Sequence, residues 1–527
     1  MPLKHWLALL VLFGLARAGR AQPPADSLSW FAAGRPLPDA WQAVDLLATA
    51  DADGLVPDDY QAATLRRALT LTTVGPVAAA TEQADVDRRL TAAMLRYLTE
   101  LHSGRIDPQQ IHENFDRPAS PFDPAAALQS ALAAHRLPDL ATQAAPSIPL
   151  YASLRSALAR YRALADHPAW NTPLPPPAKR KLEPGQPWPG LGVLTARLNA
   201  LGDLSDVDNL APGLSVPERY EGALVDAVRR FQERHGLTAD GVIGRDTLAN
   251  LDVTPEARAR QIEVTMERLR WTPLLLEPRM VVINIPEFVL RAYDVRDGRP
   301  DIATTMKVIV GKALDTRTPI FDEDMRYIEF SPYWNVPPSI ARAETVPKLR
   351  RDARYFSQQG FEFVAGDGRV ITTLSPASLD AVLRGELRIR QRPGPQNALG
   401  DIKFVFPNND NIYLHHTPTP RLFSRDRRDF SHGCIRVEAP LELAKFVLRN
   451  DPDWPEERIV EAMAKGESST LRLREPVRVL IAYSTVIAGG DGRLFFFADL
   501  YGHDRLLDEA LRRRSVTLPG SLAGGAQ

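Results

Sequence analysis

The single cysteine of this chain lies in the sequence Ser-His-Gly-Cys, at position 434. A thiol acts as a nucleophile through its thiolate, and a nearby imidazole can take the proton. Three of the ten histidines lie close to Cys434 in the sequence, namely His415, His416 and His432. This combination of a thiol with several imidazoles predicts nucleophilic catalysis by Cys434.

The paired histidines and the glycine of this stretch have different expected positions. His415 and His416 end an apolar segment that favours a strand, and successive strand side chains point to opposite faces. We therefore expect only one of the two to face the thiol. Gly433 allows a tight backbone turn, and the N–H groups of such a turn can stabilise an oxyanion.

Three other interpretations of the cysteine stay open at this point. A zinc ion could bind Cys434 and His432 with one of the two neighbouring histidines, although no paired cysteines or His-x-x-x-His spacing supports it. The cysteine could also be inert and buried. A papain-like peptidase fits poorly, because its cysteine precedes its histidine, and only His503 follows Cys434.

Composition limits the class of protein. A chain of 527 residues predicts two to four domains. Hydrophobic residues make up 44% and charged residues 24%, which is ordinary for globular protein. The net charge of −1 provides no basic field to attract nucleic acid. The 45 prolines predict linkers and long loops.

Residues 1–21 have the pattern of a cleaved signal peptide. Lys4 precedes an apolar run at 6–16, and small residues follow it. This run is too short to span a bilayer, where roughly 20 residues are needed. An uncleaved helix on the membrane surface is the alternative. Export makes the single thiol conspicuous, because cysteines in oxidising compartments are usually paired.

Two segments of the N-terminal half have helical patterns. Residues 27–165 predict a helical domain, in which apolar residues recur at spacings of three and four before Gly104. Residues 166–190 are so rich in proline that we expect an extended linker. Residues 191–251 predict a small helical bundle, with a stripe that ends at Gly236.

From about residue 275 to 510 the pattern is β-rich. Residues 279–295 are β-branched and apolar around a Pro-Glu turn, which predicts a hairpin. A segment at about 337–395 is polar and helix-prone. It is too long for an ordinary loop, so we expect a lid or a substrate-binding insertion.

The catalytic stretch resembles the signature of the L,D-transpeptidases, and the domain order resembles the large periplasmic members from Gram-negative bacteria. That signature is a histidine, a gap of roughly 14–17 residues, and then Ser/Thr-His-Gly-Cys. The stretches that carry the resemblance are "LRYLTELHSGRIDP", "WNVPPSI", "RQRPGPQNALGDIKFVFPN", "IYLHHTP", "LFSRDRRDFSHGCIRV" and "LYGHD". Within residues 191–251, the Phe-Gln, Gly-Leu and Asp-Gly pairs resemble the peptidoglycan-binding domain type.

The resemblance implies an α+β multidomain fold. It combines a helical N-terminal scaffold, a small helical peptidoglycan-binding domain, and a β-rich L,D-transpeptidase catalytic domain with a lid insertion.

The resemblance also implies roles for the catalytic stretch. Cys434 corresponds to the nucleophile and His415 to the general base. His432 stands where the large enzymes do not always have histidine, so we expect an orienting role. His416 occupies a position that is usually Gly, Asp or Ser, and its role stays open.

Five further positions follow as oxyanion or substrate contacts. The backbone N–H groups of Gly433 and Cys434 correspond to the oxyanion site. Ser431 and Arg436 flank it, and Arg436 stands where smaller relatives have Asn and could contact a stem-peptide carboxylate. Tyr413 and Trp334 are weaker candidates, with core packing as the alternative.

The implied activity is 3→3 cross-linking of peptidoglycan stem peptides through a Cys thioester, in the periplasm, with no metal or organic cofactor. The family also implies acylation by carbapenems. The expected partners are stem peptides, glycan strands and other cell-wall synthesis enzymes, but not nucleic acid or, after signal cleavage, a stable membrane span. The alternatives are an L,D-carboxypeptidase, a lipoprotein-anchoring transpeptidase and a non-catalytic wall-binding protein.

Overall fold

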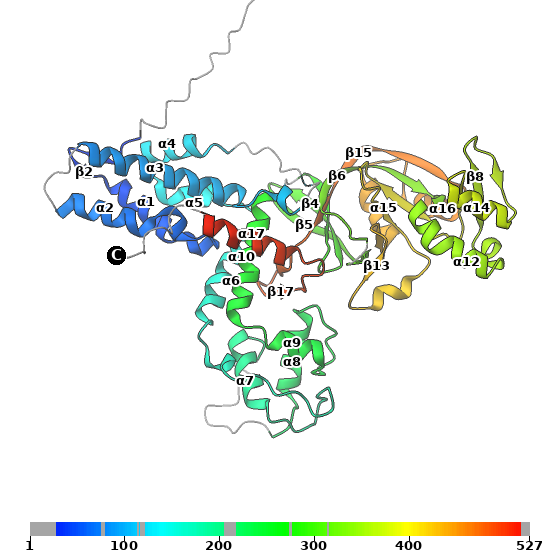
Figure 1. Cartoon of the computed structure of the whole chain (residues 1–527), viewed down its shortest axis with the longest axis horizontal. Coiled ribbons are helices and arrows are strands. Elements are labelled where there is room, and N and C mark those ends of the chain that lie inside the picture. Colours follow the sequence, from blue (N-terminus) through cyan, green and yellow to red (C-terminus); the bar gives the residue numbers. More distant parts are fainter. Residues whose placement is uncertain are drawn as a thin grey trace, which may run out of the picture.

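A computed structural model describes residues 28–74, 80–112, 115, 122–204, 218–272, 277–313 and 316–517. The expected signal peptide at 1–21 lies outside these residues. Figure 1 shows a helical region at one end, a large sheet next to it, and a smaller insertion at the far end, with a small helical bundle to one side. No helix in the described ranges is long and apolar enough to cross a bilayer. The α+β architecture expected from the sequence is confirmed.

The N-terminal region is helical because its apolar residues recur with the helical period. On α3 (Ala80–Ser103), Leu90, Met94 and Leu98 are fully buried or nearly so and face the core of this region. A short hairpin of β1 (Phe31–Ala32) and β2 (Arg35–Pro36) precedes the helices. The other helices are α1 (Pro38–Ala48), α2 (Ala62–Val74), α4 (Pro124–Ala133), α5 (Leu137–Ala144) and α6 (Pro149–Ala163).

The small bundle consists of α7 (Leu191–Leu201), α8 (Ala223–Glu233) and α9 (Arg245–Leu251). The proline-rich stretch before it differs from the extended linker that we expected. Its residues Leu174, Leu182 and Trp188 are buried in the core of the bundle, and Leu182 forms a β-bridge with Ile243. Proline prevents helix formation but leaves apolar side chains between the prolines free to pack.

Helix α10 (Pro255–Trp271) joins the bundle to the sheet, and the sequence patterns did not predict it. Thr254 caps its first turn by accepting a hydrogen bond from the N–H of Ala257 at 3.2 Å, and Pro255 occupies its first position. Many charged residues of α10 are buried, including Glu267, which accepts hydrogen bonds from the backbone N–H groups of Arg105 and Ile106. The buried Ala259, Ile262, Met266 and Leu269 of α10 recur at helical spacing, but buried charged residues alternate with them, which obscures this stripe in the sequence.

Nine strands of the described chain form one sheet in the order β13-β5-β14-β12-β11-β6-β15-β3-β4. The predicted hairpin at 279–295 is confirmed as β3 and β4. The strands are β3 (Arg279–Asn284), β4 (Val289–Arg296), β5 (Arg299–Gly311), β6 (Phe321–Phe330), β11 (Ile402–Val405), β12 (Leu414–His415), β13 (Asp429–Ser431), β14 (Ile435–Val437) and β15 (Ser469–Ala482). Helices α15 (Pro440–Leu448) and α16 (Glu456–Ala464) share its main core.

The insertion contains a second sheet, not only the helical turns that its polar sequence suggests. Its strand order is β7-β10-β8-β9, and it has its own apolar core. The elements are β7 (Trp334–Asn335), α11 (Pro338–Ile340), η6 (Ala341–Thr345), α12 (Val346–Arg351), α13 (Arg354–Gln358), β8 (Phe361–Ala365), β9 (Val370–Ile371), α14 (Pro376–Arg384) and β10 (Leu387–Gln391).

The last described part of the chain returns to the junction between the helical region and the sheet. A hairpin of β16 (Val486–Ala488) and β17 (Leu494–Phe496) is followed by α17 (His503–Thr517). Helix α17 lies beside α10 where the helical region meets the sheet (Figure 1).

Candidate functional site

Cys434 lies in the turn between β13 and β14. Gly433 has φ of +111°, a backbone conformation that residues other than glycine rarely adopt. The hydroxyl of Ser431 spans the turn, because it accepts a hydrogen bond from the Gly433 N–H at 3.2 Å and donates one to the Cys434 carbonyl at 2.6 Å. Ser431 therefore stabilises the turn through its side chain, and the N–H of Gly433 is already hydrogen-bonded to it.

Strand register places the key side chains on one face of the sheet. Strand β12 runs parallel to β14, with Leu414 opposite Ile435 and His415 opposite Arg436. Leu414 and Ile435 are fully buried on the core face. Because side chains alternate along a strand, His415 and Arg436 lie on the other face, and Cys434 shares the face of Arg436.

His415 is held as a neutral imidazole with one defined tautomer. Only 4% of its surface is exposed, and its Nδ1 lies 2.5 Å from the backbone carbonyl of His416. A carbonyl can only accept, so Nδ1 carries the proton and Nε2 is free to act as a base. Burial, together with the positive charges of Arg436 and Lys403, lowers the pKa of His415 to about 3.

Cys434 is also neutral at rest. Burial raises the pKa of its thiol, while hydrogen bonds from Tyr413 and the charges of Lys403 and Arg436 act in the opposite direction. The thiol is a free one, and its Sγ lies 3.6 Å from the carbonyl oxygen of Asn411. A raised thiol pKa next to a lowered imidazole pKa means that no thiolate–imidazolium pair is formed in advance.

Tyr413 stands beside both catalytic candidates. Its ring centroid is 5.7 Å from that of His415. Burial and the neighbouring Cys434 raise the pKa of Tyr413 well above its ordinary value. Tyr413 thus lies next to the thiol, and its contact with substrate stays a prediction. Trp334 packs against the core of the insertion, as the alternative interpretation has it.

Lys403 and Glu329 belong to the same face, although the sequence patterns did not single them out. Lys403 is opposite His415 in the β11–β12 register and opposite Glu329 in the β11–β6 register. Its Nζ lies 3.2 Å from Glu329 and 4.3 Å from the ring centroid of Tyr413. In "IKFVFPN", Lys403 stands between the buried residues Ile402 and Phe404. This alternation was the only sequence feature that could have indicated that Lys403 lies on the face of the sheet opposite the core.

One guanidinium nitrogen of Arg436 is unpaired within the part of the chain that the structure describes. This nitrogen is Nε, which is buried and has no hydrogen-bond partner among the described residues. Burial lowers its pKa from the ordinary arginine value. A buried guanidinium nitrogen without an acceptor is a feature that a bound carboxylate can satisfy.

The other two histidines take different partners. His416 Nδ1 lies 2.7 Å from Asp401. His432 Nε2 lies 2.7 Å from Glu344 of η6, so the turn that carries Cys434 is paired with the insertion. No group of three His, Cys, Asp or Glu side chains in the described ranges could hold a metal ion.

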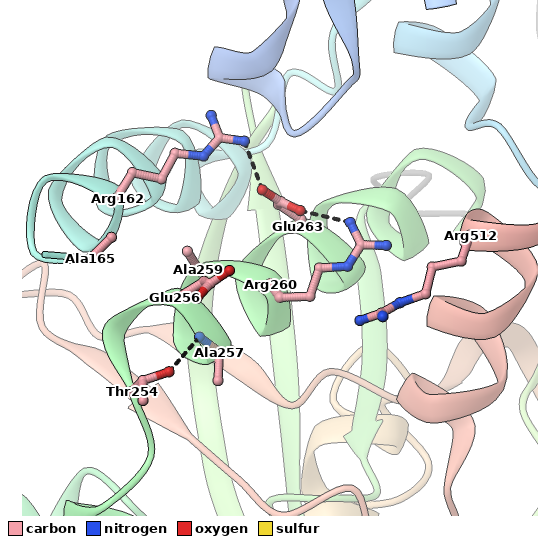
Figure 2. A pocket seen from close by; sticks show the side chains of 9 residues that line it. All are labelled: Arg162, Ala165, Thr254, Glu256, Ala257, Ala259, Arg260, Glu263 and Arg512. Atoms are coloured by element: carbon pink, nitrogen blue, oxygen red, sulfur yellow. Dashed lines mark hydrogen bonds and ion pairs between the residues drawn. The ribbon is translucent and has the colours of Figure 1, made fainter. Parts of the chain in front are cut away.

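A separate open cavity of about 500 Å³ lies where α6, α10 and α17 meet. Figure 2 shows that Arg162 and Arg260 both point to Glu263, each with a hydrogen bond of 2.7 Å. Arg162 also pairs with Asp51 and Arg260 with Asp508, so both arginines have more than one acidic partner. No site residue predicted from the sequence lines this cavity. The lining residues are Arg162, Ala165, Thr254, Glu256, Ala257, Ala259, Arg260, Glu263 and Arg512.

Three family models match consecutive parts of the chain. Residues 278–461 match the L,D-transpeptidase catalytic domain, also named YkuD. Residues 24–158 match the "Scaffold domain", and residues 190–251 match the "Putative peptidoglycan binding domain". By these matches, residues 278–461 correspond to an L,D-transpeptidase catalytic domain, in a chain that also has matches to a scaffold domain and a peptidoglycan-binding domain.

A curated relative supports the same class. The "Putative L,D-transpeptidase" of Haemophilus influenzae is 32% identical over 233 residues, which are 44% of this chain and 45% of the relative. The chain thus matches less than half the length of that relative.

Two solved structures show weak similarity. An L,D-transpeptidase from Stackebrandtia nassauensis has 12% identity and a TM-score of 0.22, covering 54% of this chain and 90% of its own. A "Fused Zn-dependent amidase/peptidase/peptodoglycan-binding domain-containing protein" from Clostridium acetobutylicum has 11% identity and a TM-score of 0.17, with coverage of 57% and 99%. Scores this low support no conclusion.

Proposed function

We propose that this protein is a peptidoglycan L,D-transpeptidase that forms 3→3 cross-links through a thioester on Cys434. The observation that carries the proposal is the grouping of a thiol, a neutral imidazole with a free Nε2, and a guanidinium whose Nε has no partner in the described chain, on one face of β12 and β14. The catalytic-domain match supports the same class of reaction.

Acylation begins with the neutral pair. His415 Nε2 takes the thiol proton as Sγ of Cys434 attacks the carbonyl carbon of the third residue of a tetrapeptide stem. The C–S bond forms, and the carbonyl electron pair moves to oxygen. When the oxyanion collapses, the C–N bond breaks, and the nitrogen of the terminal D-Ala leaves with the proton from His415.

Transfer of the acyl group repeats these steps with an amine as nucleophile. The side-chain amine of the diamino acid in a second stem attacks the thioester carbonyl and gives a proton to His415. The C–S bond then breaks, and the sulfur of Cys434 takes that proton back. The product is an amide between two third residues, and the enzyme is regenerated without a redox step.

Arg436 is the candidate for recognising the donor. The terminal D-Ala of a tetrapeptide carries a carboxylate one residue beyond the reacting carbonyl. A carboxylate can accept two parallel hydrogen bonds from a guanidinium. Arg436 is opposite His415 in the register, and its Nε has no other partner in the described chain.

The remaining parts of the chain fit action on the cell wall. The match of residues 190–251 supports peptidoglycan binding by the small bundle. We further propose export to the periplasm by residues 1–21 and contacts with other cell-wall synthesis enzymes. The limits 27–165, 191–251 and 275–510 stay predictions for the scaffold, the bundle and the catalytic domain.

Mass spectrometry of muropeptides made by the purified full chain tests the proposal. Tetrapeptide substrate should give 3→3 dimers and free D-Ala with the wild type, and none with Cys434→Ala. His415→Ala should lose the activity, whereas the adjacent substitution His416→Ala serves as control and should largely keep it.

The same assay distinguishes the alternatives when a lipoprotein with a free lysine is added as acceptor and sacculi are added in a separate binding experiment. Tripeptides without dimers would indicate an L,D-carboxypeptidase, and stems linked to a lipoprotein lysine would indicate an anchoring enzyme. Binding to sacculi without any new muropeptide would indicate a non-catalytic wall-binding protein. Each of these results would contradict 3→3 transpeptidation.

A further inference from the structure

A loop between β5 and β6 supports the cysteine turn from behind. Thr318 of this loop is fully buried. Its hydroxyl donates a hydrogen bond to the Gly433 carbonyl at 2.7 Å and accepts one from the Gly311 N–H at 2.9 Å. Both hydrogen-bonding functions of the hydroxyl are therefore used, and they fix its orientation.

The contact at the Gly433 carbonyl also determines the direction of the next N–H. The carbonyl of Gly433 and the N–H of Cys434 belong to one planar trans peptide group, so they point in opposite directions. A hydroxyl that holds the carbonyl on one side therefore aims the N–H of Cys434 toward the other side. Gly433, with φ of +111°, gives the turn no steric restraint of its own.

The two N–H groups of the turn differ in their availability. The N–H of Gly433 donates to the Ser431 hydroxyl at 3.2 Å. In the part of the chain that the structure describes, the N–H of Cys434 has no hydrogen-bond partner. It is therefore the free donor beside the thiol, although the sequence had suggested both groups as oxyanion donors.

Tyr501 holds both Gly311 and Thr318, on either side of the loop. The hydroxyl of Tyr501 donates to the Gly311 carbonyl at 2.7 Å and accepts from the Thr318 N–H at 3.2 Å. A second contact runs from the Lys312 N–H to the Ser431 carbonyl at 3.1 Å. Tyr501 belongs to the "LYGHD" stretch, which lies outside the catalytic signature in the sequence. Its contacts show that this stretch supports the loop behind the cysteine turn.

We infer that Thr318 is a positioning residue that aims the N–H of Cys434 at the oxyanion formed during acyl transfer. The inference rests on the proposed function, because it needs an acylation step. It adds a residue that touches neither substrate nor thiol, and it gives Tyr501 a supporting role behind Thr318.

Two reactions of the same thiol separate positioning from general damage. Acylation by a carbapenem passes through an oxyanion, whereas alkylation by iodoacetamide displaces iodide and forms none. Thr318→Val removes the hydroxyl at similar size. Loss of one oxyanion donor costs about 10²- to 10³-fold, so a misaimed donor should slow acylation by about 10- to 100-fold. Alkylation should keep its rate, and Thr318→Ser should restore acylation.

Intact-protein mass spectrometry of the full chain measures both rates. Equal slowing of acylation and alkylation, or unchanged acylation in Thr318→Val, would overturn the inference. If this variant does not fold, Tyr501→Phe takes its place, because it removes the hydroxyl that holds Thr318 and Gly311. It should slow acylation selectively, and unchanged acylation would count against the role of Thr318.

The outcome for the wild type separates the two proposals. A wild-type thiol that iodoacetamide alkylates but no carbapenem acylates would overturn the proposed acyl transfer and the role of Thr318 together. A wild type that is acylated at the same rate as Thr318→Val would overturn the role of Thr318 alone.

Discussion

At the scale of single residues, the environment of Cys434 favours the neutral thiol over the thiolate. Burial raises its pKa, and the same burial lowers the pKa of His415 to about 3. The proton must therefore leave during attack, when formation of the S–C bond withdraws electrons from sulfur and makes its proton acidic enough to pass to His415 Nε2. Such a thiol is protected from adventitious oxidation, because oxidants react with the thiolate.

The pH dependence of alkylation tests this state of Cys434. Because the thiol pKa is raised, the thiolate fraction at neutral pH is low, and the iodoacetamide rate should climb with its midpoint above that of an ordinary thiol. Lys403 lowers this pKa, so Lys403→Met should move the midpoint to still higher pH. A midpoint that falls in this variant would contradict the assignment.

Arg436 gives a second prediction at this scale. Hydrogen bonds to charged groups contribute about 1.5–3 kcal/mol, so Arg436→Met should raise KM for a tetrapeptide donor by about 10- to 100-fold. A donor with an amidated C-terminus lacks the carboxylate and serves as control, since its KM should hardly change. Equal losses for both donors would show that Arg436 acts on something other than the carboxylate.

At the scale of elements, the insertion is an independently packed unit that meets the catalytic turn at a polar contact. It has its own core around Phe361 and Phe363, and Glu344 of η6 pairs with His432 at 2.7 Å. Both side chains are partly exposed. Exposed pairs contribute about 0–1 kcal/mol, so this contact can be opened at small cost.

Hydrogen exchange measures that opening. Glu344→Gln should speed amide exchange in α12, by up to about fivefold if the pair contributes 1 kcal/mol. Glu386→Gln is a matched control, because Glu386 pairs with Arg384 inside the insertion and does not reach the catalytic turn. If the two variants exchange alike, the pair with His432 does not hold the insertion.

At the scale of the whole molecule, buried polar groups connect the helical region to the sheet. His112 of the N-terminal region lies against His503 of α17, with ring centroids 4.5 Å apart. Burial lowers the pKa of each to about 3. On α10, Glu267 is fully buried between Arg105 and Arg270. Separation of these parts would break the contacts of Glu267 with Arg105, whereas removal of one partner within the folded chain would leave an uncompensated buried charge.

These histidines predict acid sensitivity. In the unfolded chain, histidine binds a proton below a pKa of about 6.5, whereas the folded chain excludes it until about pH 3. The unfolded state therefore binds more protons, and stability falls as pH drops from about 6.5 toward 3. Thermal unfolding followed by circular dichroism should show a falling Tm, and His112→Phe should reduce the slope. An equal slope would exclude His112 as a cause.

Features that depend only on neighbouring residues could be predicted from the sequence alone. Periodicity predicted a helix in the region of α3, and β-branched apolar residues around a Pro-Glu turn predicted the hairpin of β3 and β4. The combination of one thiol with nearby imidazoles predicted Cys434 as a nucleophile, while His415 as its base is implied by the family resemblance and stays a prediction. The α+β architecture with a β-rich C-terminal half followed from these patterns. Their physical basis is local, because a helix or strand that buries one face must have apolar residues at a regular spacing along the sequence.

Only the tertiary structure decided which distant residues meet. Lys403 faces His415 through strand register, and Thr318 reaches Gly433 across 115 positions of sequence. The proline-rich stretch packs into the bundle, and α10 buries charges that pair with other segments. No local repeat encodes these contacts, because a partner's position along another strand or helix depends on how the whole chain packs.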